Sequence, residues 1–419
     1  MCREALKFID AITLGIFAIL VFLSVIGMAV YDVSWPFNTL ILSNIFNEIL
    51  LFIALIKVYV YFDKDRITAI IGLLLLSFFL MLHIIGQCNY EQVISLIVAM
   101  MGIRIEKIIK VYVATTGTTL LITFIAAITG MIFNGSVLIP SRVVKQVYYL
   151  GFSGHNPPMA LWLFFSLALL YLIKDTDKNI IIVFIMICIT ICLYLATGSN
   201  TSFIIAIVCH IAGLVNFIIV ERKKSKTAIK ISRNIAAAMI FVPLISILIT
   251  VVGLIVYGKY GRTEHLTTLS HRYEILYWEF SMSGVKMPFQ ALRDVNAATV
   301  DFSYFLSEDI TSEVYKNIDF NLFRGLGTLT RGQLFGGSDI EYGNILLYDG
   351  LMVLFPYRIL SIYLLYRVYR KKEYILMICI VASVFYGNFE ALKSGYTVCQ
   401  IMLLPLFANV GSLKMKKQL

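Results

Sequence analysis

Residues 179–197 read NIIIVFIMICITICLYLAT, a run without a single charged side chain. The hydrocarbon core of a bilayer is about 30 Å thick, and an α-helix needs about 20 apolar residues to cross it. Of the 419 residues in the chain, 59% are hydrophobic and only 14% are charged. Because such a composition lacks the polar surface of a soluble domain, the chain is predicted to be an all-α polytopic membrane protein.

Apolar windows of this kind recur along most of the chain and predict about twelve transmembrane helices. The predicted spans are residues 11–30, 39–62, 67–86, 88–103, 111–133, 157–173, 179–197, 202–220, 234–256, 342–366, 374–391 and 396–411. They divide the chain into residues 1–256 with nine helices, a long loop at 257–341, and residues 342–419 with three helices.

The placement of basic residues predicts the orientation of these helices. Lys and Arg accumulate in short cytoplasmic loops, and most of the 35 in this chain fall in alternate connections, including ERKKSKTAIKISR at 221–233 and RVYRKK at 367–372. Both termini are therefore expected in the cytoplasm, with the first span retained as a signal anchor. The net charge of +10 is then an orientation signal, so we expect no binding of nucleic acid.

The loop at 257–341 is predicted to be extracytoplasmic and to contain a helix at the membrane interface. Within LTTLSHRYEILYWEFSMSG at 266–284, Leu269, Tyr273, Leu276 and Phe280 recur at helical spacing.

The sequence contains no recognisable nucleotide or metal motif. The P-loop, GxGxxG, HExxH and GxSxG patterns are absent, and the seven cysteines show no paired spacing. DKD at 63–65 and DTD at 175–177 resemble metal-binding acidic pairs, but both fall in short predicted loops without an attached domain. We therefore expect a protein that needs no metal and no other cofactor.

The predicted topology places a set of polar side chains on the outer side of the membrane. These candidates are Arg142, Lys145, His155, Asn156, Arg262, His271, Arg272, Glu341, Asn344 and Glu390, together with the turn ATGSNTS at 196–202. Such clustering on one face is what an active site at the membrane surface requires.

Five stretches in this region resemble the Wzy-type polysaccharide repeat-unit polymerases of the O-antigen polymerase and ligase superfamily. They are LGFSGHNPPMAL at 150–161, YLATGSNTSFI at 194–204, LSHRYEILYWEFSMSGVKMPF at 269–289, EYGNILLYDGLMVLF at 341–355, and GNFEALKSG with IMLLPLF near the end. They follow the order of that family from about residue 100 onward. Three positions depart from its pattern: Asn200 replaces an arginine, Gly343 replaces an acid or histidine, and His155 and Asn156 precede Pro157.

The resemblance implies a GT-C-like membrane glycosyltransferase in the bacterial plasma membrane. Its substrate would be a polyprenyl-pyrophosphate-linked oligosaccharide, and its product a capsular, exo- or O-antigen polysaccharide. Chain-length regulator and flippase proteins would be partners, besides membrane lipids. Arg142, Arg272, His271, His155 and Glu390 would be catalytic, while Lys145, Asn156, Arg262, Asn344 and Glu341 would bind substrate.

Each of these residues also has a simpler interpretation. Arginines at a membrane face bind lipid phosphate or extend toward the interface, and His155 before two prolines is typical of a helix cap. ATGSNTS has the composition of a tight turn between helices, and His83 and His210 are expected to be structural. Within the spans, Glu48 and Asp349 would either join helices or contact substrate.

Two other functions fit the same topology. A ligase would transfer a finished glycan to another acceptor, and sequence does not separate it from a polymerase. A transporter of lipid-linked sugars would also have about twelve spans, but transporters tend to contain internal repeats, and the halves of this chain show none.

The predicted topology has a direct test. Single cysteines placed at Ser136 and Ser283 in a cysteine-free variant should react with a membrane-impermeant maleimide in intact cells, because both positions are predicted outside. Labelling that occurs only after lysis would reverse the orientation and move the candidate site to the other side.

Overall fold

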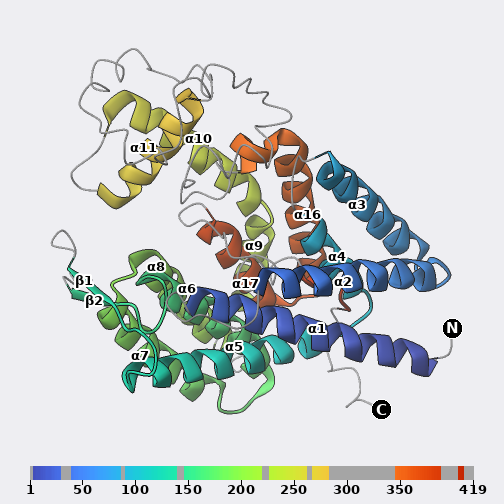
Figure 1. Cartoon of the computed structure of the whole chain (residues 1–419), viewed down its shortest axis with the longest axis horizontal. Coiled ribbons are helices and arrows are strands. Elements are labelled where there is room, and N and C mark those ends of the chain that lie inside the picture. The colour runs from blue at the N-terminus through green and yellow to red at the C-terminus, as the bar shows by residue number, and fades with distance from the viewer. Residues whose placement is uncertain are drawn as a thin grey trace.

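The computed structural model describes residues 3–29, 39–85, 90–138, 146–218, 226–261, 267–282, 345–387 and 404–409. Its helices are α1 Arg3–Ala29, α2 Thr39–Phe62, α3 Arg66–Ile84, α4 Glu91–Ala99, α5 Ile105–Ile128, α6 Asn156–Leu172, η1 Ile173–Asp175, α7 Asn179–Thr197, α8 Asn200–Val215, α9 Lys226–Met239, α10 Val242–Tyr260, α11 Thr267–Met282, η5 Ile345–Asp349, α16 Gly350–Arg370, α17 Tyr374–Tyr386 and η8 Leu404–Leu406. Two short antiparallel strands, β1 Ser136–Leu138 and β2 Gln146–Tyr148, complete the described elements. Figure 1 shows the whole arrangement.

The described helices form a multi-pass membrane protein. Within the described ranges, nine helices are long and apolar enough to cross a membrane, and α17 is a shorter apolar helix. Large apolar side chains point outward from them: Phe52 is 65% exposed, Phe184 55% and Leu248 60%. A surface of this kind is stable in lipid and costly in water, which confirms the predicted class.

Polar contacts between helices hold the interior together. Trp162 of α6 donates its indole N–H to the Thr190 hydroxyl of α7 at 2.9 Å. His210 of α8 lies 3.0 Å from the Ser166 hydroxyl of α6, in agreement with its predicted structural role. Such hydrogen bonds between small polar groups help to associate helices in lipid.

The predicted continuous helix over residues 88–103 is wrong. Helix α4 has nine residues, which corresponds to about 14 Å, or roughly half of the hydrocarbon thickness. From Met100 to Arg104 the chain is not helical, and Gly102 has φ +78°. A helix therefore enters the bundle and is continued by irregular backbone.

A distant segment satisfies the backbone at this break. Gly102 N–H donates to the Phe407 carbonyl at 3.2 Å, and Asn409 N–H donates to the Ile103 carbonyl at 2.8 Å. The prediction of a regular helix through 396–411 is also wrong at 404–409, because η8 is only a short 3₁₀ turn. Since buried backbone groups need hydrogen-bond partners, these two segments depend on each other.

Two cations, Lys57 fully buried and Arg367 partly buried, complete the same region. Lys57 of α2 is fully buried and pairs with Asp10 of α1, and it also donates to the Met101 carbonyl at 3.1 Å. Arg367 of α16 donates to the Leu406 carbonyl and to the Ala408 carbonyl, the latter at 3.0 Å. The charges therefore bind carbonyl groups that the interrupted helix leaves without helical partners.

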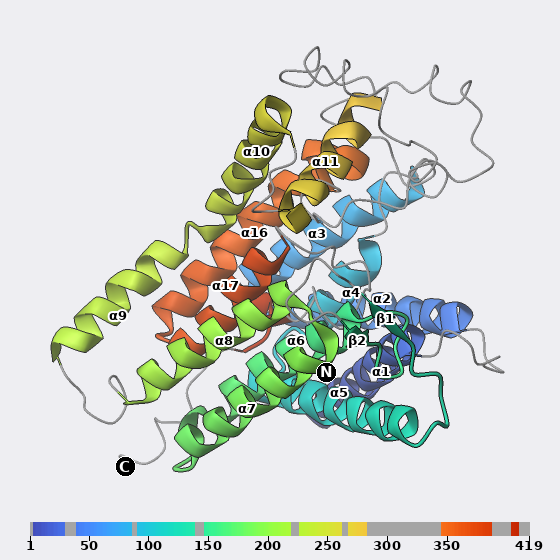
Figure 2. The ribbon, with the colours of Figure 1, turned by 90° about the vertical axis from the view of Figure 1, so that its left-hand side faces the viewer.

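Two predicted spans are each divided into two helical elements. The span at 234–256 is divided between α9 and α10, and Pro243 stands in the first turn of α10. Figure 2 shows α9 leading into α10 with a bend between them. The span at 342–366 becomes the π-helical turn η5 followed by α16, which extends to Arg370.

Contacts between helix ends agree with the alternation that the charges predict. On the predicted inner side, Lys174 after α6 pairs with Glu373 before α17 at 2.6 Å. On the predicted outer side, Ser153 N–H donates to the Met28 carbonyl at the end of α1 at 3.0 Å. Segments assigned to one side thus contact one another.

The interrupted crossing generates a prediction about Gly102. A Cβ at this position would lie 1.5 Å from the Tyr61 hydroxyl oxygen, and the backbone already has a positive φ. Gly102→Ala should therefore lower the free energy of unfolding by roughly 2–4 kcal/mol, from left-handed backbone strain and from overpacking. Denaturation in detergent micelles measures the change.

Gly15→Ala in α1 is the matched control, because no atom lies within 4 Å of its added Cβ. We expect no loss of stability from this variant. If both variants unfold at the same denaturant concentration, Gly102 is not tightly constrained by its packing and its positive φ.

Candidate functional site

Helix α11 packs against α10 through an aromatic contact. A Cβ on Gly253 of α10 would lie 2.1 Å from the Tyr273 ring, so only glycine allows this approach. The Tyr273 hydroxyl donates to the Ile249 carbonyl at 3.3 Å. Burial raises the pKa of Tyr273 to about 12, so the phenol remains a neutral donor near pH 7. The helix predicted in the long loop is therefore confirmed, and α10 fixes its position.

Helix α11 buries charge as well as apolar surface. Arg272 and Glu274 are each only 6% exposed. The Tyr257 hydroxyl of α10 donates to a Glu274 carboxylate oxygen at 3.1 Å. Since residues two apart on a helix face different directions, Arg272 and Glu274 lie on different sides of α11. Helix α11 is therefore enclosed on several sides.

Helix α16 and the turn before it contain two further buried charges. Asp349 is 1% exposed and ends the π-helical turn η5, and Gly350 follows with φ +70°. Arg358 is 2% exposed, and its guanidinium carbon lies 5.6 Å from the centre of the Tyr357 ring. π-helical turns often occur at functional sites, and a charged residue inside a membrane span marks function by default.

Helix α10 connects these two groups of charges. It contacts both α11 and α16. Together α11, η5 and α16 carry two buried guanidinium groups and two buried carboxyl groups. Guanidinium binds phosphate through paired hydrogen bonds, while a carboxylate can accept a proton from a hydroxyl group. We use the name outer charge cluster for Arg272, Glu274, Asp349 and Arg358, the buried charges on α11, at the end of η5 and on α16.

The segment before α6 is folded by hydrogen bonds rather than by a histidine cap. Leu150 N–H donates to the Asn134 side-chain carbonyl at 2.9 Å, and Gly151 has φ +84°. His155 occupies the residue before α6, but its side chain forms no capping hydrogen bond, and prolines follow Asn156 in the first turn. The predicted capping role of His155 is therefore wrong, because the prolines leave fewer N–H groups to cap.

The stretch ATGSNTS forms the predicted tight turn. Helix α7 ends at Thr197, Gly198 has φ +62°, and α8 begins at Asn200. The Ser202 hydroxyl lies 3.4 Å from the hydroxyl of Tyr386 in α17. The turn thus links the outer ends of α7 and α8 to α17.

Most of the remaining site residues predicted from the sequence lie at positions that the structure does not describe. Arg142, Lys145, Arg262, Glu341, Asn344 and Glu390 lie outside the described residues. His271 lies in α11, of which the backbone is described at this position. Of the predicted residues, Arg272 is thus the one that the described structure places in the outer charge cluster.

Sequence reasoning missed three residues of this region: Tyr257, Glu274 and Arg358. The sequence alone could have indicated Arg358, because an arginine within an apolar span is costly and rare. It contained no such indication for Tyr257 and Glu274, since a tyrosine near a helix end and an acid in a loop helix are ordinary features. Their significance comes from the packing of α11 on α10.

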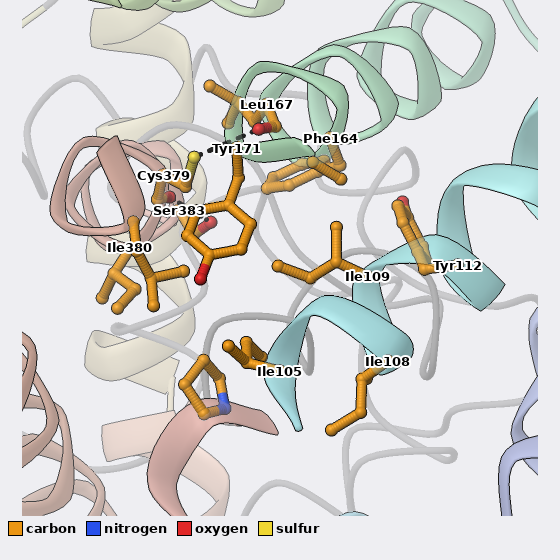
Figure 3. Close-up of a pocket in the computed structure, with 13 residues that line it drawn as sticks. Ile105, Ile108, Ile109, Tyr112, Phe164, Leu167, Tyr171, Cys379, Ile380 and Ser383 are labelled. Atoms are coloured by element: carbon orange, nitrogen blue, oxygen red, sulfur yellow. Dashed lines mark hydrogen bonds between the residues drawn. The ribbon is translucent and has the colours of Figure 1, made fainter. Parts of the chain in front are cut away.

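A separate cavity lies between α5, α6 and α17 (Figure 3). Its volume is about 20 Å³, and it is lined mainly by apolar side chains, with Tyr171 pointing into it. Cys379 donates its thiol to the Leu167 carbonyl at 3.2 Å on one wall. A space of this size holds about one water molecule, so it is a packing defect and too small for a sugar.

No group of three or more His, Cys, Asp or Glu side chains that could hold a metal occurs among the described residues. Comparisons with protein-family models, with curated proteins and with solved structures each find no match for this chain. The site must therefore be interpreted from its own residues.

The hydrogen bond from Tyr257 to Glu274 generates the next prediction. Tyr257→Phe removes the donor to a buried carboxylate and should reduce stability by about 1–3 kcal/mol. Tyr260→Phe is the matched control, because Tyr260 lies one turn later in α10 and is 63% exposed. The loss of stability caused by Tyr260→Phe should be within about 0.5 kcal/mol. Equal stability of the two variants in denaturant would show that α11 does not depend on this contact.

Proposed function

We propose that this protein is a membrane glycosyltransferase that polymerises polyprenyl-pyrophosphate-linked oligosaccharide repeat units at the outer face of the bacterial plasma membrane. The observation that carries the proposal is the burial of Arg272, at 6% exposure, on the helix packed against α10. This arginine lies in the stretch LSHRYEILYWEF, which is part of the resemblance to the Wzy-type polymerases. A guanidinium that only binds lipid phosphate at the surface would remain exposed.

The reaction requires a cation beside the leaving group. A sugar hydroxyl oxygen attacks the anomeric carbon of the growing chain, and the bond from that carbon to the pyrophosphate oxygen breaks. The lipid pyrophosphate leaves with the bonding electrons, and the hydroxyl proton passes to a base. Arg272 would stabilise the negative charge as it develops, with Arg142, Lys145 and Arg262 as further cations from the sequence.

The base would be a carboxylate or histidine on the same side. His271, Glu390 and His155 are the catalytic candidates from sequence, and the structure adds Glu274, whose carboxylate accepts a hydrogen bond from Tyr257. Asn156, Glu341 and Asn344 would bind sugar hydroxyls. Because the donor is already activated as a pyrophosphate, the proposed reaction needs no metal or nucleotide.

A transporter is the second candidate, and the break after α4 favours it. Interrupted helices bind substrates or ions in many transporters. In this protein, however, Lys57 and the 404–409 segment already pair with polar backbone groups at the break. The break therefore resembles a structural junction more than an ion site.

Arginine variants test the proposal. Arg272→Ala and Arg142→Ala should each reduce polymer formation by roughly 30-fold to 1,000-fold, which corresponds to about 2–4 kcal/mol of lost transition-state stabilisation. Lysine should rescue poorly, because a point charge does not reproduce the forked donors of arginine. Polymer is measured at equal protein level in the membrane.

Arg66→Ala is the control, since Arg66 is exposed at the start of α3 on the predicted inner side. It should leave polymer formation unchanged. Normal polymer from both Arg272→Ala and Arg142→Ala would remove the phosphate-binding role and favour lipid contact for these side chains.

A further inference from the structure

The lipid-facing surface of α5 does not end with the helix. Leu121 and Ile128 are exposed on one face of this helix, within a segment long and apolar enough to cross a membrane. Beyond the helix, Met131 is 78% exposed, Phe133 65% and Leu138 69%. We call these last three residues the apolar strip. Exposed apolar surface thus continues along the chain from the membrane span into strand β1.

The chain folds back onto α5 where the helix ends. Gly130 has φ +75°. The N–H groups of Met131 and Ile132 both donate to the Ala126 carbonyl, at 2.8 Å and 3.2 Å. A glycine in the left-handed conformation followed by such bonds is a common way to end a helix. Met131 therefore lies beside the last turn of α5.

The other end of the hairpin packs at the depth of the last turns of α5. A Cβ on Gly151 would lie 3.1 Å from the Ala127 Cβ and 3.2 Å from the Thr123 Cγ2. The Phe152 ring packs edge to face on the Phe124 ring, with 6.2 Å between their centres. Strand β2 also contacts α7, and Figure 1 shows the two elements together. Both ends of the hairpin are thus held beside transmembrane helices.

We propose that the hairpin lies in the interface of the outer leaflet, with the apolar strip inserted among the upper parts of the lipid acyl chains. The occupant of this surface is lipid, because the strip continues a face of α5 that is itself exposed to lipid. The polar Ser136 would stay among the head groups, where water still reaches it. Lipid cover removes large apolar side chains from water, where their exposure is costly.

The composition of the hairpin agrees with this position. Residues 129–138 and 146–154 contain no charged side chain. Tyr148 and Tyr149 are aromatic residues of the kind that is enriched at the membrane interface. The inference requires only that the protein spans a membrane, and it is independent of the proposed glycosyltransferase activity.

Fluorescence quenching in lipid nanodiscs tests the position of the apolar strip. Phe133→Cys and Leu138→Cys are each made in a cysteine-free variant of the full chain, labelled with bimane and reconstituted in phosphatidylcholine and phosphatidylglycerol. Nitroxide-labelled phosphatidylcholine should quench both probes as strongly as a probe at Leu121→Cys, which is 60% exposed on the lipid-facing side of α5. Iodide in the buffer should quench all three probes weakly.

Lys178→Cys is the aqueous control, because Lys178 is exposed just before α7 on the predicted inner side. Iodide should quench this probe strongly, and the nitroxide lipid should quench it weakly. Size-exclusion profiles identify the folded variants, and Met131→Cys replaces either strip variant that does not fold. Strip probes that respond like Lys178→Cys would place the hairpin in water. Strip probes shielded from both quenchers would show that protein covers the strip, and either result would overturn the proposal.

Discussion

In the interior of a membrane protein, a backbone N–H or C=O without a partner costs several kcal/mol, because no water replaces the missing hydrogen bond. Most of this chain meets the constraint with regular helices. The segment after α4 does not, since its helix ends after nine residues. Its stability therefore depends on the 404–409 segment, whose Phe407 carbonyl accepts from Gly102 and whose Asn409 N–H donates to Ile103. Helices from both ends of the chain must assemble before this crossing is complete.

Charged side chains inside the described bundle differ in their partners and in their place. Lys57 and Arg367 bind an acid and backbone carbonyls around the break, so they stabilise the fold. The outer charge cluster lies instead on α11 and α16, and its Asp349 stands where a π-helical turn and a positive φ at Gly350 interrupt regular helix. Charges placed beside irregular backbone on the predicted outer side are the features that a phosphate-binding active site would need.

The sequence predicted the membrane class and most of the helices, because long apolar runs have few alternative structures. It failed at residues 88–103, where an apolar run forms a half-length helix and irregular backbone. Hydropathy does not distinguish these, since both are buried and apolar. The turn at Gly198 was predictable from its residue types, whereas the burial of Arg272 and Glu274 was not. Their environment is set by the approach of Tyr273 to Gly253, a contact between residues in separate helices.

The most direct measurement of the proposed function is the product formed by the purified protein from a synthetic polyprenyl-pyrophosphate-linked repeat unit. Glycosyl transfer between repeat units predicts a ladder of oligomers with release of the lipid pyrophosphate. A single transfer to a different acceptor would indicate a ligase. Full recovery of the unreacted repeat unit from folded protein would contradict glycosyl transfer and leave the transporter as the better account.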